Sequence, residues 1–210
     1  MANLKTEERK KQIIKVAAKV FAERGFQEST IAEISKEAKI SEASIYEYFT
    51  TKEGLLFSIP TESAKDLFGL MEFHLKLIKG SANKLRAIVY LFMDSYQTNN
   101  EFASIMMLIL KHNRKFLDTE GHKAIRKGIK NINSIIEEGI ESGEFKKDIN
   151  VYLVRSMILG TVEHLTTNWI MTGTPDQLLD YVDPIVDTLI DGISNRENRS
   201  DHWSMQKNGT

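Results

Sequence analysis

The chain has no cysteine and only 3 prolines among its 210 residues. Without cysteine there can be no disulfide, no thiolate nucleophile and no sulfur-ligated zinc, which favours a reducing compartment such as the cytoplasm. The scarcity of proline favours long helices over short strands and turns. No run approaches 18 apolar residues, and residues 1–11 are charged, so we expect neither a membrane span nor a secretory signal.

Catalytic signatures are also missing from the sequence. No histidines are spaced i, i+4, and there is no HExxH, GxGxxG, P-loop or GxSxG segment. Glu163 and His164 are adjacent in a predicted helix, where a satisfied polar pair or a ligand-pocket group explains them better than a catalytic dyad. A small helical enzyme is therefore disfavoured, and we expect no metal and no cofactor.

Charge is distributed unevenly along a chain whose net charge is −1. A local excess of positive charge in the first 24 residues suits contact with phosphates. A solvated helix face would explain the same pattern. The seven basic residues stand against three glutamates: Lys5, Arg9, Lys10, Lys11, Lys15, Lys19 and Arg24 against Glu7, Glu8 and Glu23.

The first fifty residues predict a helix-turn-helix unit. An amphipathic helix over residues 7–24 ends at Gly25, and the capping box Thr30-Ile31-Ala32-Glu33 opens a short helix over residues 31–38. Ser41 caps a second short helix over residues 42–48, and residues 50–53 begin a fourth helix. In such a unit the second short helix enters the major groove of DNA.

Residues 13–56 resemble the DNA-binding domain of the TetR family of repressors. The shared residues are Ala17, Phe21, Gly25, Thr30, Ile31, Ile34, Ala38, Ser41, Tyr46, Tyr48, Phe49, Lys52, Glu53 and Leu55. The resemblance implies a homodimer on an inverted-repeat operator, with DNA contacts at Thr30, Ser44, Tyr46, Tyr48 and Lys52. The second short helix, over residues 42–48, and its cap would also present Ser41, Glu42, Ala43 and Glu47 to DNA.

Three positions depart from the family pattern. Lys39 stands where the inter-helix turn often carries glycine, which implies backbone strain. Glu42 and Glu47 bring negative charge near phosphates, which would weaken binding and make it salt-dependent. Either glutamate could instead accept a hydrogen bond from a cytosine amino group. We favour repulsion for Glu42 and leave both interpretations open for Glu47.

The rest of the chain predicts an all-α protein of about nine helices. We expect domains at residues 1–52 and 53–194, then a disordered tail over residues 195–210. Helices are expected over residues 52–80, from 81 onward, over 102–110 (buried on most sides), 120–142 and 150–171. A capping pattern at residues 174–177 would open the last helix, and Pro184 would kink it.

The last two helices are apolar enough to pack against a second subunit. We predict a dimer interface at Ile158, Leu165, Trp169, Leu178, Val182 and Val186. Aromatic and methionine side chains in the middle helices suit an apolar ligand cavity, although they also suit a plain core. The predicted ligand residues are Phe68, Met71, Phe92, Tyr96, Met106, Leu110, Lys111, Arg114 and His164.

Residues 137–173 are similar to the FadR branch of the TetR family, whose members release DNA on binding long-chain acyl-CoA. The matching residues are Gly139, Gly143, Glu144, Met157, Gly160, Thr161, Thr166, Thr167 and Trp169. Cations at Lys111, His112, Arg114, Lys115, Lys123, Arg126 and Lys127 could meet the phosphates, or form a solvated surface. The alternatives are a repressor of an efflux or detoxification gene that responds to a hydrophobic xenobiotic, and a helical ligand-binding protein without DNA binding.

The resemblance also implies how the two activities are coupled. The effector would prefer the conformation that cannot bind DNA and would move the helix that begins near Lys52.

Overall fold

The computed structural model describes residues 2–195, apart from the side chains of residues 2–5, 65 and 66. Nine α-helices and no β-sheet occur within this range, which confirms the predicted all-α class. The predicted tail, except Asn195, lies outside the described residues. The chain forms two compact units, one of residues up to Phe68 with Ser95–Arg126, the other of Gly69–Asp94 with residues from Lys127 onward.

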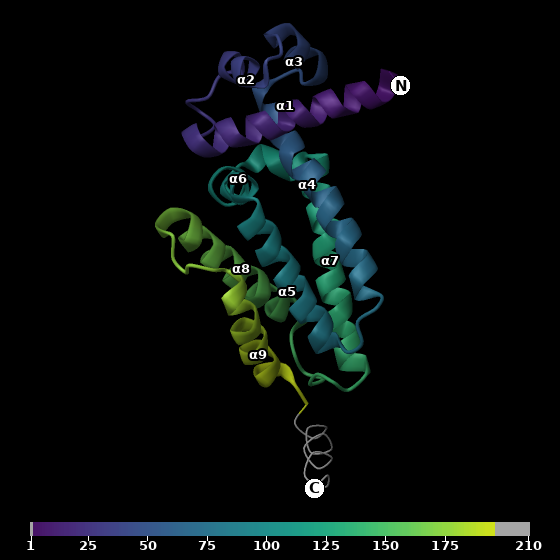
Figure 1. Ribbon diagram of the computed structural model, residues 1–210. Helices are drawn as coiled ribbons and strands as arrows, with labels where there is room; N and C mark the ends of the chain where they lie inside the picture. The colour runs from purple at the N-terminus through teal and green to yellow at the C-terminus, as the bar shows by residue number, and fades with distance from the viewer. Residues whose placement is uncertain (1, 196–210) are drawn as a thin grey trace, which may run out of the picture. The chain divides into compact units, whose positions relative to one another are not determined.

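The first unit carries the three predicted helices of the helix-turn-helix. These are α1 (Ala2–Arg24), α2 (Ile31–Ala38) and α3 (Glu42–Tyr48), and the first part of α4 (Lys52–Leu75) follows them. Within this unit, α2 and α3 lie on one side of α1 and α6 (Asn100–Ser104) lies on the other (Figure 1). The bounds of α2 and α3 agree with the prediction, whereas α4 ends earlier than the predicted residue 80.

One hydrophobic core joins the helix-turn-helix to a segment far away in sequence. It holds Ile14 and Phe21 of α1, Ile45 of α3, and Phe102 and Leu110 from the segment after α5. The DNA-binding helices therefore do not form a core limited to residues 1–52. The predicted domain limits stay a prediction, but apolar burial in this unit extends beyond them.

The apolar segment after Phe102 differs from the buried helix that the sequence predicted. The short α6 is followed by a π-helix over Ile105–Leu110, in which the amide of Lys111 donates to the Met106 carbonyl at 3.1 Å. Leu108 is 43% exposed, but most of residues 102–110 are buried, so the predicted burial on most sides is confirmed. The wider π-turn shifts the side-chain positions from those of an α-helix, which changes the face that each residue occupies.

The second unit holds the end of α4, most of α5 (Ser81–Thr98), most of α7 (Glu120–Glu141), and all of α8 (Val151–Thr172) and α9 (Val182–Ile193). Glu144 caps α5, because its carboxylate accepts hydrogen bonds from the amides of Ser81 and Ala82 at 2.7 and 2.9 Å. The ring of Phe145 lies against Gly139, where a Cβ atom would be 2.2 Å from it. Both contacts anchor the turn that follows α7.

The predicted start of the last helix was wrong. Residues 173–178 form an irregular connection, a short 3-10 turn follows at Leu179–Tyr181, and α9 begins at Val182. Leu178, at the end of this connection, is fully buried. A capping box contributes about 1 kcal/mol, whereas burying a leucine contributes about 1.5–3 kcal/mol, so packing outweighs the local signal.

The two prolines in helices also differ from the prediction. Pro184 is the third residue of α9, where a backbone amide has no acceptor within the helix, so it removes no helical hydrogen bond and the predicted kink has no cause. Pro60 does lie inside α4, and the sequence reading did not single it out. Gly121 approaches this turn closely, since a Cβ there would be 2.8 Å from Thr61 Oγ1 and 3.4 Å from Pro60 Cγ.

None of the helices within residues 2–195 is both long and apolar enough to cross a membrane.

Candidate DNA-binding and sensing surfaces

Helix α3 keeps one side for the core and offers the rest to solvent. Ile45 and, just after the helix, Phe49 are buried, whereas Glu42, Ala43, Tyr46 and Glu47 are exposed. Ser44 and Tyr48 are half-buried. The predicted DNA-facing residues of this helix are therefore accessible, which the groove-reading role requires.

The starts of α2 and α3 are held by their own side chains. Thr30 Oγ1 accepts from the Glu33 amide at 3.2 Å, and Glu33 accepts from the Thr30 amide at 2.9 Å, which confirms the predicted capping box. The second of these bonds is the main reason that the pKa of the Glu33 carboxyl lies below its usual range. Ser41 Oγ accepts from the Ser44 amide at 3.1 Å, as predicted.

Lys39 adopts the left-handed conformation that the sequence led us to expect. Its φ of 56° and ψ of 41° make it the C-terminal cap of α2. Residues with a Cβ are disfavoured there, so this turn carries strain that glycine would not.

A phosphate contact suggests that the Lys52 ammonium is solvated, but it is hydrogen-bonded within the chain. The ammonium donates to the carbonyl oxygens of Phe26 and Ser29, both at 2.7 Å, and to that of Gln27 at 3.4 Å. It also lies 4.4 Å from the centroid of the Phe26 ring. The next residue, Glu53, pairs with Lys115 at 2.8 Å.

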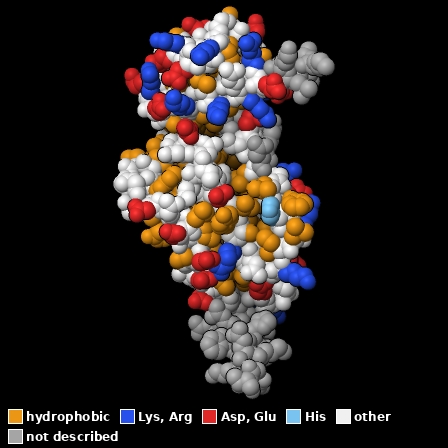
Figure 2. Space-filling view, viewed as in Figure 1, with side chains coloured by type: hydrophobic (Ala, Val, Ile, Leu, Met, Phe, Trp, Pro, Cys, Tyr) orange, Lys and Arg blue, Asp and Glu red, His pale blue; other side chains and the backbone are white. Residues whose placement is uncertain are grey.

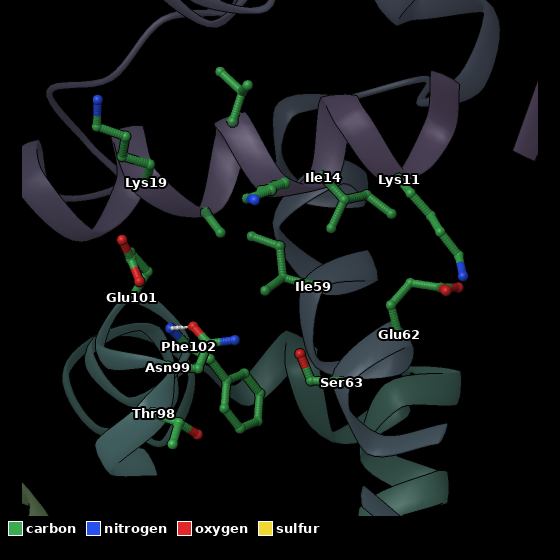
Figure 3. A pocket seen from close by; sticks show the side chains of 13 residues that line it. Lys11, Ile14, Lys19, Ile59, Glu62, Ser63, Thr98, Asn99, Glu101 and Phe102 are labelled. Atoms are coloured by element: carbon green, nitrogen blue, oxygen red, sulfur yellow. Dashed lines mark hydrogen bonds between the residues drawn. The ribbon is translucent and has the colours of Figure 1, made fainter. Parts of the chain in front are cut away.

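Three cavities lie in the described part of the first unit, and the two larger ones adjoin the segment after α5. One, of about 610 Å³, is bounded by α1, α4 and α6. Ile14 and Ile59 point toward each other across it, and Lys11 and Lys19 lie at opposite ends (Figure 3). The other, of about 660 Å³, is lined by the α1–α2 loop and by residues 108–115, and it includes Arg24, Arg114 and Lys115.

The predicted ligand residues occur in both units. In the first unit Leu110 is buried, Phe68, Tyr96 and Met106 are half-buried, and Lys111 and Arg114 are exposed. In the second unit Met71 and Phe92 are buried, but His164 is exposed and lies 3.2 Å from its neighbour Asn168. His164 thus lies at the surface of the second unit, and its predicted ligand contact stays a prediction.

The predicted dimer interface stays a prediction. Ile158, Leu178, Val182 and Val186 are buried within the single chain, although Ile158 also lines a groove between α8 and α9. Only Leu165 and Trp169 stay partly exposed. Periodicity identified the apolar helices but could not distinguish the side that faces their own core from the side left open.

The open side of α8 and α9 is an apolar groove of about 620 Å³ in the second unit. Charged side chains of both signs crowd the surface around α1 to α3, whereas hydrophobic side chains gather on the other unit (Figure 2). We call the apolar groove along α8 and α9 the α8–α9 groove. It is lined by residues that include Leu153, Met157, Thr161, Leu165, Tyr181, Ile185 and Thr188.

Comparison with known protein families assigns both parts of the chain. Residues 13–59 match the family of bacterial regulatory proteins named after tetR, and residues 64–192 match the C-terminal region of YsiA-like proteins of the same family. The chain belongs to the TetR family. The TetR resemblance that the sequence suggested is confirmed, and the protein is a transcriptional regulator with a helix-turn-helix.

Several proteins similar to this TetR-family chain are regulators of fatty acid metabolism or degradation. A fatty acid metabolism regulator of Bacillus subtilis is 29% identical over 185 residues, which span 88% of this chain and 95% of the relative. A crystal structure of FadR from Bacillus subtilis in complex with stearoyl-CoA is 28% identical, with a TM-score of 0.81 over 87% of this chain and 98% of that one. FadR from Bacillus halodurans is 26% identical, also with a TM-score of 0.81, over 88% and 95% of the two chains.

Proposed function

We propose that this protein is a cytoplasmic repressor, not an enzyme, that binds a palindromic operator as a dimer and releases it on binding a long-chain fatty acyl-CoA. The observation that carries the effector is the similarity to a FadR bound to stearoyl-CoA, which extends over 87% of this chain. A similarity of this extent includes the sensing helices as well as the helix-turn-helix.

The shared core of the first unit supports a path from effector to DNA. Leu110 and Phe102 belong to the same hydrophobic core as Ile14 and Ile45. An acyl chain beside Met106 and Leu110 would repack this core beneath α1. Because tightly packed cores adopt discrete arrangements, such repacking moves the recognition helix instead of being absorbed locally.

The effector must bind better to the conformation that cannot bind DNA. A tenfold preference changes the operator affinity tenfold, which corresponds to about 1.4 kcal/mol of coupling. An effector without this preference would bind but release nothing.

The test begins by selecting the operator from random duplexes with the purified dimer. Fluorescence anisotropy of the selected duplex is then measured with stearoyl-CoA, octanoyl-CoA or free coenzyme A. We expect release at micromolar stearoyl-CoA and none with coenzyme A. Binding that stearoyl-CoA leaves unchanged at tens of micromolar would overturn the effector, and failure to select any duplex would overturn the repressor.

A further inference from the structure

The ammonium of Lys52 is surrounded by main-chain carbonyls of the loop between α1 and α2. Phe26 and Ser29 each accept at 2.7 Å and Gln27 accepts at 3.4 Å, while the Phe26 ring covers another side of the cation. A lysine ammonium has three N–H groups and no acceptor. These three carbonyls therefore use all its donors and leave none for a DNA phosphate.

The loop that Lys52 holds leads directly into the DNA-binding elements. It begins at Gly25, whose φ of 79° ends α1, and it reaches Thr30, the N-cap of α2. Ser29 is 1% exposed, and its hydroxyl donates to the Gly25 carbonyl at 2.6 Å. Lys52 thus holds the carbonyl of the residue that immediately precedes Thr30.

We propose that Lys52 is a positioning residue. It fixes the α1–α2 loop, and through it Thr30 and the start of α2, against the first turn of α4, and it does not itself neutralise a phosphate. To reach a phosphate the ammonium would have to leave three carbonyls without their donor. Lys52 thereby acts on operator affinity through the orientation of α2.

The two roles predict different dependence on salt. A lysine that neutralises a phosphate releases counterions, so its loss reduces the slope of log K against log salt by about 0.9 for each protomer. A positioning lysine changes affinity without changing the number of neutralised phosphates. Its loss therefore lowers K at every salt concentration and leaves the slope unchanged.

The substitution Lys52→Arg also distinguishes a phosphate contact from a positioning role. The planar guanidinium of arginine binds phosphate at least as well as an ammonium does, so Lys52→Arg would preserve a phosphate contact. The same flat group cannot direct three N–H donors from one nitrogen toward three converging carbonyls. A positioning role predicts that Lys52→Arg weakens operator binding in the same direction as Lys52→Met.

The experiment compares Lys52→Met and Lys52→Arg with Lys115→Met in the full-length dimer. Lys115 is a matched control, because it pairs with neighbouring Glu53 but makes no hydrogen bond to the α1–α2 loop. We expect about tenfold weaker operator binding for both Lys52 variants at an unchanged salt slope. A lower slope for Lys52→Met, with wild-type binding by Lys52→Arg, would overturn the proposal.

Hydrogen exchange of the DNA-free dimer tests the proposal even if an operator cannot be obtained. Amides of residues 26–31 should exchange faster in both Lys52 variants, whereas those of α8 should keep their wild-type protection. Unchanged exchange in the loop would overturn the positioning role. If Lys52→Met fails to fold, the exchange and the operator affinity of Lys52→Arg decide the matter: faster exchange in the loop with weaker binding supports the positioning role, and wild-type values of both overturn it.

Discussion

The recognition surface on α3 and the α8–α9 groove use exposed side chains in opposite ways. Nine of the large hydrophobic side chains that are exposed within residues 2–195 belong to the second unit, and three belong to the first. Of these three, only Tyr46 lies on α3. The difference teaches which partner each surface suits, because a hydrated DNA groove is read by polar contacts and a protein partner buries apolar area.

The first prediction tests the apolar surface. Met157 is 52% exposed in the α8–α9 groove, where the last two helices predict the dimer interface, so Met157→Glu should leave the single chain folded and place a charge in that predicted interface. We expect a monomer in sedimentation velocity and at least about 100-fold weaker operator binding, because a monomer reads only one half-site.

Tyr90→Glu is the control for this prediction. Tyr90 is 47% exposed in the same unit, and it lies on α5 outside the α8–α9 groove. The Tyr90→Glu variant should remain dimeric. A dimeric Met157→Glu would remove the contrast between the two surfaces.

The second prediction tests the polar surface. Tyr46 is 50% exposed on α3, so Tyr46→Ala should weaken operator binding by about 1–3 kcal/mol without changing the dimer. Fluorescence anisotropy and sedimentation measure the two effects. Tyr90→Ala removes an equally exposed tyrosine from the second unit and should bind DNA like the wild type; equal losses in both variants would contradict a specific role for α3.

The third prediction concerns the turn between α2 and α3. Lys39→Gly relieves a left-handed residue, which costs about 1–2 kcal/mol, but adds chain entropy, so we expect a net gain below about 1 kcal/mol in unfolding free energy. Lys36→Gly, inside α2, should instead destabilise by about 1 kcal/mol. Denaturant titration measures both, and a loss of stability in Lys39→Gly would show that this turn carries no strain.

The smallest expected effect concerns negative charge on α3. Glu42→Gln should strengthen operator binding about threefold at low salt, since it removes repulsion by phosphates, and less at high salt, where charge is screened. Anisotropy titrations across salt concentrations measure this change. A weaker complex for Glu42→Gln would instead support a contact from Glu42 to a base.

The elements of the helix-turn-helix could be predicted because their stabilising contacts are local. Thr30 and Glu33 cap each other three residues apart, and Ser41 meets the Ser44 amide at the same spacing. The strained turn at Lys39 was predictable from the family pattern, because the inter-helix turn often carries glycine there. The nature of the effector came from resemblance, because no short pattern in the sensing helices is specific for an acyl chain.

Other features depend on residues that are far apart in the chain. The partners of Lys52 lie 23 to 26 positions earlier, so a family pattern alone assigned this lysine to DNA. The start of α9 depends on the burial of Leu178. Which side of α8 stays open depends on the residues that bury Ile158.

The sequence by itself determined that this protein is a helical TetR-family regulator, and where its recognition helix begins and ends. Capping patterns and apolar spacing within one or two helical turns are sufficient for the helices, and the resemblance of residues 13–56 supplied the family. Only the tertiary structure decided which apolar side chains stay exposed. It also decided that the Lys52 ammonium is hydrogen-bonded to main-chain carbonyls within the chain. Both depend on neighbours that the fold brings together from distant parts of the sequence.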